Sequence, residues 1–253
     1  MDYKYKISLI IPCYNSEVLL AETLDNLLGQ TLKDIQLIIV NDGSTDSTAD
    51  IIADYAAKNS NILCVEQKNA GVAAARNNGI RRAEGRYIAL LDADDLWEPF
   101  FLESQLALMN EHNALLVYGA HKRIDANNNE YLKPFIPPKR ITYTDLLKTC
   151  SITCLTGLYD TSKYGKFYLH EEFRSLRDDY IYWLEIIKKT GEAWGNQNII
   201  GSYRILGNSV SRNKKKVIKP QFMVYYKVEK LGLIRSLYYL ANWAIQGFLK
   251  YRK

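Results

Sequence analysis

Three aspartates, Asp92, Asp94 and Asp95, directly follow a short run of β-favouring apolar residues at positions 87–91. The run predicts a buried strand, so the three carboxylates would lie where that strand leaves its sheet. Carboxylates crowded together are costly unless a cation offsets their charge. A divalent metal that carries phosphates would do this, because hard cations bind carboxylate oxygens. The alternative is a solvated acidic turn that caps the next helix.

A second acidic pair, Asp178 and Asp179, precedes residues with helical spacing, namely Ile181, Leu184 and Ile187. The pattern predicts a helix that is anchored in the core, with both carboxylates in its first turn or at its cap. A carboxylate held beside a substrate hydroxyl can act as a general base. The alternative is that both acids only cap the helix.

The elements that would position these acids alternate along the first part of the chain. Helical segments separate four predicted strands, at residues 7–11, 35–40, 61–66 and 87–91. Repeated β-α units predict a largely parallel sheet with helices on both faces. Polar clusters follow all four strands, at residues 12–15, 41–43, 68–71 and 92–95. Ligands bind at this edge of open α/β sheets, which favours the metal and phosphate interpretation of the carboxylates.

The phosphates are not predicted to be held by a glycine-rich loop. The turn after the first strand, residues 12–15, has no glycine, and no Gly-Lys-Ser/Thr segment occurs in the chain. This excludes a dinucleotide-binding GxGxxG turn and a P-loop. Tyr14 could instead stack on a base, and Asp42 could accept a hydrogen bond from a base N–H such as the imide of uracil. The alternatives are simple packing for Tyr14 and an Asx-turn with Gly43 for Asp42.

The middle of the chain, residues 98–175, carries no motif. We expect regular elements there at four places, a helix at 99–111, a strand at 115–118, a short helix at 144–150 and a strand at 152–159. The proline-rich segment 134–138 is predicted to be a loop without regular structure.

Four segments resemble, in order, the successive motifs of family 2 inverting glycosyltransferases. They are ISLIIPCYN at 7–15, IVNDGSTD at 39–46, NAGVAAARNNG at 69–79 and LDADD at 91–95. The resemblance, which extends to bacterial surface-polysaccharide glycosyltransferases, implies an α/β fold: a single A-type glycosyltransferase domain with a mostly parallel central sheet covered by helices. It implies a catalytic domain at residues 1–215, with a nucleotide-sugar-binding half at 1–97 and an acceptor half at 98–215.

The resemblance also implies roles for individual residues. The donor would be a nucleotide-diphosphate sugar, UDP-linked in view of Asp42, bound by Pro12, Tyr14, Asn15, Asp42, Asn69, Gly71, Arg76, Asp92 and Ala93. A divalent metal cofactor, Mn²⁺ or Mg²⁺, would be held by Asp94 and by Asp92. Asp179 would be the catalytic base, in an acidic pair where Asp178 replaces the family's usual Glu.

A later segment, residues 202–212, resembles the family's Tyr-Arg-x-His-x-x-Ser-x-Ser segment. Leu206 occupies the position of the histidine, which removes one potential metal or phosphate ligand. Arg212, together with Ser209 or Ser211, is then expected to contact the donor diphosphate. The alternative for Arg212 is a solvated basic run that continues into the lysines after it.

The reaction that the resemblance implies is a single displacement. The base would make an acceptor hydroxyl nucleophilic, a metal would offset charge on the leaving diphosphate, and the anomeric carbon would be inverted. Two rival functions remain open. A nucleotidyltransferase acting on sugar phosphates would usually have a glycine-rich, basic loop after the first strand, and a non-catalytic binding protein could retain the same fold.

The C-terminal part of the chain is strongly basic. Residues 204–253 contain twelve Lys and Arg and one acid, Glu229, which gives +11 there and leaves −6 for the rest of a chain whose net charge is +5. Residues 216–253 are predicted to form a helical tail with an apolar stripe at Ile234, Leu237, Tyr238, Ala241, Ile245 and Phe248. Such a tail is typical of attachment to an anionic membrane surface, and the alternative is packing on the catalytic domain. Nucleic acid is not expected, because no known binding pattern accompanies the basic residues.

The location of the protein is predicted from three observations. The first residues are polar and lead into a strand, so no signal peptide is expected. No window reaches the roughly 18 apolar residues of a membrane-spanning helix. The four cysteines form no CxxC pair, and Cys150 and Cys154 are expected to be small core residues. We expect a cytoplasmic protein, peripheral at the inner face of the cytoplasmic membrane, that extends a surface glycan on a polyprenyl-diphosphate-linked acceptor.

Overall fold

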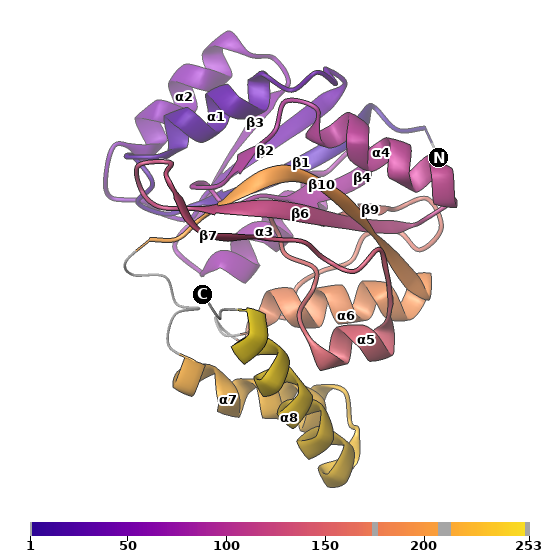
Figure 1. The fold of residues 1–253 in the computed structure, drawn as a ribbon. Coiled ribbons are helices and arrows are strands. Elements are labelled where there is room, and N and C mark those ends of the chain that lie inside the picture. Colours follow the sequence, from indigo (N-terminus) through magenta and orange to yellow (C-terminus); the bar gives the residue numbers. More distant parts are fainter. Residues whose placement is uncertain (1, 174–176, 207–213, 251–253) are drawn as a thin grey trace.

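A central sheet lies between two layers of helices, and a further helical segment lies against one of these layers (Figure 1). The computed structural model describes residues 2–173, 177–206 and 214–250. Its helices are α1 (Leu20–Leu28), α2 (Thr48–Lys58), α3 (Val72–Arg82), α4 (Phe101–His112), α5 (Tyr143–Lys148), the 3-10 turn η1 (Glu171–Phe173), α6 (Asp178–Thr190), α7 (Lys214–Met223), the π-helical turn η3 (Val224–Val228) and α8 (Gly232–Lys250). Its strands are β1 (Tyr5–Cys13), β2 (Ile35–Asn41), β3 (Ile62–Glu66), β4 (Gly85–Leu90), β5 (Leu96–Trp97), β6 (Leu116–Ile124), β7 (Glu130–Phe135), β8 (Arg140–Thr142), β9 (Leu158–Asp160) and β10 (Glu192–Arg204).

The first four strands form a parallel half of the sheet, in the order β3-β2-β1-β4. Alternate residues of β1 face opposite layers: Leu9 and Ile11 lie in one core and Ile10 lies in the other. Because side chains alternate along a strand and both faces are buried, these strands have continuous apolar sequences. The predicted α/β fold, with helices on both faces of the sheet, is confirmed.

The second half of the sheet mixes strand directions. β9 pairs antiparallel with both β4 and β6, and β10 runs parallel to β6 but antiparallel to β5 and β8. The expected loop at 134–138 is wrong in part, because Pro134 and Phe135 belong to β7. Within the described residues β7 pairs with β6 alone. It is thus an edge strand, where the missing N–H of a proline is tolerated.

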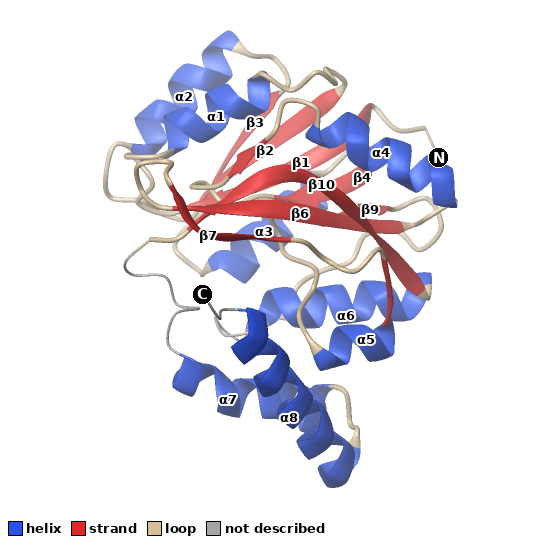
Figure 2. Ribbon diagram, viewed as in Figure 1, coloured by secondary structure: helices blue, strands red, loops and turns tan. Residues whose placement is uncertain are grey.

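The two helical layers each close one hydrophobic core against the sheet (Figure 2). α1, α2 and α4 contribute Leu24, Ile52 and Leu102 to the first core. α3, α5 and α6 contribute to the second, where Ile80 and Trp183 are fully buried. With both faces covered, the polar residues that follow the strands are left at the carboxyl edge of the sheet.

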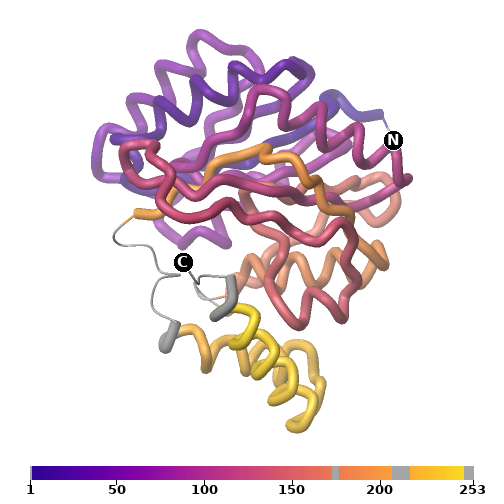
Figure 3. Tube along the Cα trace, viewed as in Figure 1, coloured from indigo at the N-terminus to yellow at the C-terminus, as the bar shows by residue number. Residues whose placement is uncertain are grey.

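The C-terminal helical segment, residues 214–250, comprises α7, η3 and α8 and lies beside α5 and α6 (Figure 3). Val224 and Tyr225 of η3 belong to the second core. Glu229, whose side chain is 1% exposed, has its Oε2 2.6 Å from the Nζ of Lys188 on α6. Packing on the domain, the alternative considered for this tail, is therefore seen on this side of the segment. No helix within the described residues has both the length and the apolar character needed to cross a bilayer.

Candidate active site

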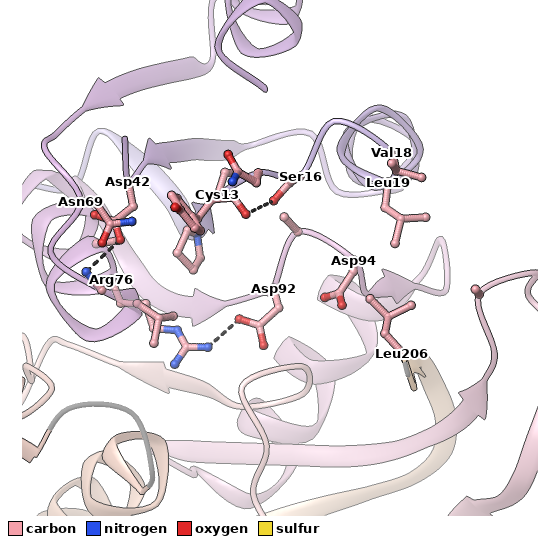
Figure 4. A pocket seen from close by; sticks show the side chains of 18 of the residues that line it. Cys13, Ser16, Val18, Leu19, Asp42, Asn69, Arg76, Asp92, Asp94 and Leu206 are labelled. Carbon is pink, nitrogen blue, oxygen red and sulfur yellow. Dashed lines mark hydrogen bonds and ion pairs between the residues drawn. The ribbon is translucent and has the colours of Figure 1, made fainter. Parts of the chain in front are cut away.

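The polar clusters that follow the first four strands meet around one pocket of about 1010 Å³ (Figure 4). The amino end of α3 lies beside it, through Gly71, Val72 and Arg76. All the residues predicted to bind the donor or the metal line this pocket, except for Arg212: Pro12, Tyr14, Asn15, Asp42, Asn69, Gly71, Arg76, Asp92, Ala93 and Asp94. Arg212, with Ser209 and Ser211, lies outside the described residues.

Asn15 joins the loop after β1 to the loop after β2. Its backbone has a positive φ of 48°, and its side-chain oxygen accepts a 2.8 Å hydrogen bond from the backbone N–H of Thr45. Its own N–H donates to the hydroxyl of Ser44 at 3.0 Å. The bonded loop leaves the neighbouring Tyr14 53% exposed at the pocket. The ring therefore lies on the pocket surface and is not packed in the core.

Asp42 is buried and organises the next loop. Its Oδ1 accepts hydrogen bonds from Nε2 of Gln67 at 2.7 Å and the backbone N–H of Ala70 at 2.8 Å, and its Oδ2 accepts one from the N–H of Gly71 at 2.8 Å. The side-chain bond across this turn is made by Asn41, whose Oδ1 accepts from the backbone N–H of Ser44 at 3.0 Å. Asp42 thus fixes the segment that leads into α3, and a carboxylate has room for one further donor.

Arg76 connects the pocket to the acid pair of α6. Its buried guanidinium donates from Nη2 to Oδ1 of Asp92 at 2.5 Å, and its Nη1 lies 4.0 Å from Oδ2 of Asp178. Asp178 is buried, while Asp179 accepts a 2.7 Å hydrogen bond from the N–H of Tyr180. Neither member of the acid pair lines the pocket itself. The guanidinium of Arg76 therefore links Asp178 to Asp92.

Negative charge is concentrated around the end of β4. Burial, and then the charge of Asp92, raise the pKa of Asp94 to about 6. Burial, and then Asp94, raise the pKa of Asp95 well above its usual range. The pKa of Asp178 is also raised, by burial and then by Asp179, although Arg76 opposes this. Carboxyl groups in this condition would be stabilised in their charged form by an added cation.

Asp94 and Asp92 are the carboxylates that could hold such a cation. The Asp94 side chain makes no ion pair or hydrogen bond to another residue that the structure describes, whereas one oxygen of Asp92 is taken by Arg76. Across the described ranges, no cluster of three or more His, Cys, Asp or Glu is arranged to hold a metal. Mg²⁺-type sites are commonly built from one or two carboxylates together with substrate phosphates. The donor set therefore fits a metal that arrives with a nucleotide diphosphate.

Arg204, at the end of β10, was given no role by the sequence. The residue is 2% exposed, and its Nε donates to the carbonyl oxygen of Asp94 at 2.8 Å. Its Nη1 donates to Oδ1 of Asn128 at 2.7 Å, and its Nη2 to Oε2 of Glu22 at 2.9 Å. Its backbone N–H donates to Oδ1 of Asp95 at 2.8 Å, so Asp95 anchors the loop. The signal available was the arginine of the Tyr203-Arg204 pair in the 202–212 segment, but the strand that carries it was not predicted.

Leu206, which occupies the position of the histidine in the family that this sequence resembles, lines the pocket. Cys13 also lines it, and burial raises the pKa of this thiol well above its usual range. Of the two cysteines expected in the core, Cys154 is buried and Cys150 is partly buried against the second core.

Comparisons with known proteins agree with this geometry. The chain matches the family model described as Glycosyl transferase family 2 over residues 8–183. The Escherichia coli protein named UDP-Glc:alpha-D-GlcNAc-diphosphoundecaprenol beta-1,3-glucosyltransferase WfgD is 35% identical, over 98% of this chain and 95% of its own. The structure of S. aureus TarS 1-349 in complex with UDP-GlcNAc gives a TM-score of 0.69 at 21% identity, over 88% of this chain and 67% of that chain. The structure of mannosyltransferase PcManGT from Pyrobaculum calidifontis, in complex with GDP-Man and Mn²⁺, gives a TM-score of 0.68 at 17% identity, over 95% of this chain and 71% of that chain.

The sheet order and the pocket at its carboxyl edge define an α/β domain of the A-type glycosyltransferase fold, which the two solved structures share. The chain belongs to glycosyl transferase family 2. This membership favours glycosyl transfer over the nucleotidyltransferase that the sequence left open.

Proposed function

We propose that this protein transfers a sugar from a UDP-sugar to a hydroxyl of a lipid-linked glycan, with inversion of the anomeric carbon, in bacterial polysaccharide, O-antigen or capsule synthesis. The observation that carries the proposal is the single pocket in which the exposed Tyr14 ring, Asp42 and the carboxylates Asp92 and Asp94 meet. The relative WfgD is named for a UDP-sugar donor and a diphosphoundecaprenol-linked acceptor, which supports both substrate classes.

The nucleotide is bound at the edge of the sheet. Tyr14 offers a flat, exposed surface for a base, and Asp42 has a free lone pair for an imide N–H. The diphosphate lies toward Asp94 and the amino end of α3, where unpaired backbone N–H groups favour anions. Asp94 and Asp92 would hold a divalent ion, which would offset the charge that develops on the leaving diphosphate.

Asp179 acts as the base. It takes the proton of the acceptor hydroxyl as that oxygen bonds to the anomeric carbon, and the bond from this carbon to the diphosphate oxygen breaks with its electron pair on the diphosphate. Attack and departure occur on opposite sides, so one displacement inverts the configuration. Arg76 contacts both Asp92 and Asp178, the neighbour of Asp179, and so fixes the position of the acid pair relative to the donor pocket.

A panel of nucleotide-sugars tests the proposal, with UDP-glucose and a water-soluble N-acetylglucosamine glycoside as the first pair. Asp179→Asn should bind UDP with Mn²⁺ as the wild type does in calorimetry, while transfer falls about 10²–10⁴-fold. Asp94→Ala should lose the Mn²⁺-dependent part of UDP binding. A fall in donor affinity in Asp179→Asn would contradict the base role, and unchanged UDP binding in Asp94→Ala would contradict the metal role.

The same proposal places the protein peripherally at the inner face of the cytoplasmic membrane, attached through α8. The outer face of this helix exposes Leu233, Ile234, Leu237, Tyr238 and Ile245, and Ile234 is 84% exposed. The surrounding sequence carries the +11 charge of residues 204–253, which suits anionic lipid. Both substrates then meet at the surface where a lipid-linked acceptor is found.

Serine at Ile234, Leu237 and Ile245 tests the attachment more cleanly than deletion, because Tyr239 and Leu240 of the same helix pack on the second core. Each aliphatic side chain contributes about 1.5–3 kcal/mol when it leaves water, so partition to vesicles with anionic lipid should fall at least about 100-fold. Ile136→Ser, at an exposed isoleucine far from α8 in the sequence, is the matched control. Equal co-sedimentation of the triple variant and the wild type would refute attachment through this face.

A further inference from the structure

Two residues flank the acid pair Asp178–Asp179, and both contact the C-terminal helical segment. The guanidinium carbon of Arg177 lies 5.8 Å from the centroid of the Trp243 ring on α8 and 4.6 Å from that of Tyr180. The ring of Tyr180 meets that of Tyr225 on η3 edge-on, with the centroids 6.4 Å apart. The acid pair is thus held between two contacts with the same segment.

The contacts continue from ring to ring back to α8. The centroid of Tyr225 lies 5.9 Å from that of Tyr239, which is one helical turn before Trp243. The hydroxyls of Tyr180 and Tyr225 donate to the consecutive carbonyls of residues 146–147 in α5, at 2.9 and 2.7 Å. A shift of α8 against the first turn of α6 would therefore disturb several contacts together.

Packing alone would not favour an arginine at position 177, because its burial lowers the stability of the fold. Its Nε and Nη2 are buried and have no hydrogen-bond partner among the described residues. Buried donors without acceptors destabilise a fold, and an aliphatic side chain could fill the space without this penalty. A guanidinium over ring faces is directional, however, because the attraction requires the cation above the ring. A directional contact at this place can fix the first turn of α6.

We infer that Trp243 and Arg177 are positioning residues, through which the C-terminal helical segment fixes the orientation of Asp179. The inference rests on the proposed role of Asp179 as the base. A misplacement of about 1 Å can cost about 10²-fold in rate, so a small movement of the first turn is enough to matter. The segment then serves catalysis independently of any membrane attachment.

Trp243→Ala in the full chain tests this, with the water-soluble acceptor and the most active donor of the panel, so that lipid binding does not contribute. kcat should fall about 10- to 100-fold, while KM for the donor and the dissociation constant for UDP with Mn²⁺ stay at wild-type values. Trp243→Phe should restore most of kcat, because it keeps a ring over Arg177. Tyr226→Ala is the matched control, since this exposed ring stacks on Phe222 of the same segment, and it should keep the wild-type kcat.

Wild-type kcat in Trp243→Ala overturns the inference, and so does a phenylalanine variant as slow as the alanine variant. If Trp243→Ala does not fold, Arg177→Gln takes its place, with the same expected fall in kcat and partial recovery in Arg177→Lys. The two proposals fail separately. A fully active Asp179→Asn refutes the base role, whereas an inactive Asp179→Asn beside a fully active Trp243→Ala refutes only the positioning role.

Discussion

Replacement of Arg204 by methionine should release the loop that carries Asp94. The guanidinium makes hydrogen bonds to the carbonyls of Asp94 and Ala126 and to the side chains of Asn128 and Glu22. Methionine fills a similar volume, so the loss is mainly that of the polar contacts. Arg204→Met therefore separates the hydrogen-bonding role of this buried residue from its packing.

The size of the effect follows from these four contacts. A hydrogen bond that involves a charged group contributes about 1.5–3 kcal/mol net. The Glu22 side chain is 40% exposed and Asn128 is exposed, so both regain water when the arginine is lost. The two backbone carbonyls lose their donors, and the expected decrease in the free energy of unfolding is about 3–5 kcal/mol.

The decrease in stability should come with weaker metal-dependent binding. Partners behind a metal ligand typically contribute about 10–100-fold in metal affinity. Urea unfolding gives the first quantity, and titration of UDP in the presence and absence of Mn²⁺ gives the second. Arg204→Lys, which can keep the ion pair with Glu22, should lose less of both. A methionine variant within about 1 kcal/mol of the wild type, or one that loses stability but binds UDP fully, would refute the reasoning.

Two further predictions concern stability. Glu229→Gln removes the buried partner of Lys188, and because that lysine is 40% exposed the expected loss is about 2 kcal/mol in urea unfolding; an unchanged midpoint would show that the pair contributes nothing. His170 has a raised pKa, because its hydrogen bonds with Glu185 and then Glu172 outweigh the opposing effect of burial. Its contribution is complete below the unfolded pKa of about 6.5 and is lost as pH rises through the folded pKa, so His170→Gln should destabilise more at about pH 5.5 than at about pH 8.5. An equal effect at both values would contradict the charge-based account.

The carboxyl-edge pocket could be predicted because its residues follow strands of strong apolar pattern. Asp42 and Asp94 are about fifty positions apart, yet each lies in the loop that follows a buried strand of one parallel half-sheet. The topology of β-α units then brings their loops together without further information. The roles of these residues as donor and metal ligands stay predictions.

The contacts that hold the pocket in shape could not be predicted in this way. Arg204 reaches Glu22 across 182 positions, and the strand β10 that carries it changes register twice against β6. Its sequence, EAWGNQNIIGSYR, has neither a continuous apolar run nor a regular alternation. Asp42 likewise finds its donors in the 67–71 loop, which only the folded arrangement of β2 and β3 defines. The local sequence pattern predicts single helices and strands. The contacts of Arg204 and Asp42 depend instead on how two such elements pack together.

The tail shows why two sequence interpretations need not exclude each other. α8 is apolar on more than one side: Tyr239 and Leu240 pack against the second core, while Ile234 and Ile245 lie on the exposed stripe that its spacing predicted. A helix that is apolar on both sides is normally covered on both. The domain covers one side within the described residues, and the basic charge of the segment suits an anionic lipid surface for the other. Packing and the proposed membrane attachment would then use different faces of one helix, and the residues that join it to the acid pair lie on the packed face.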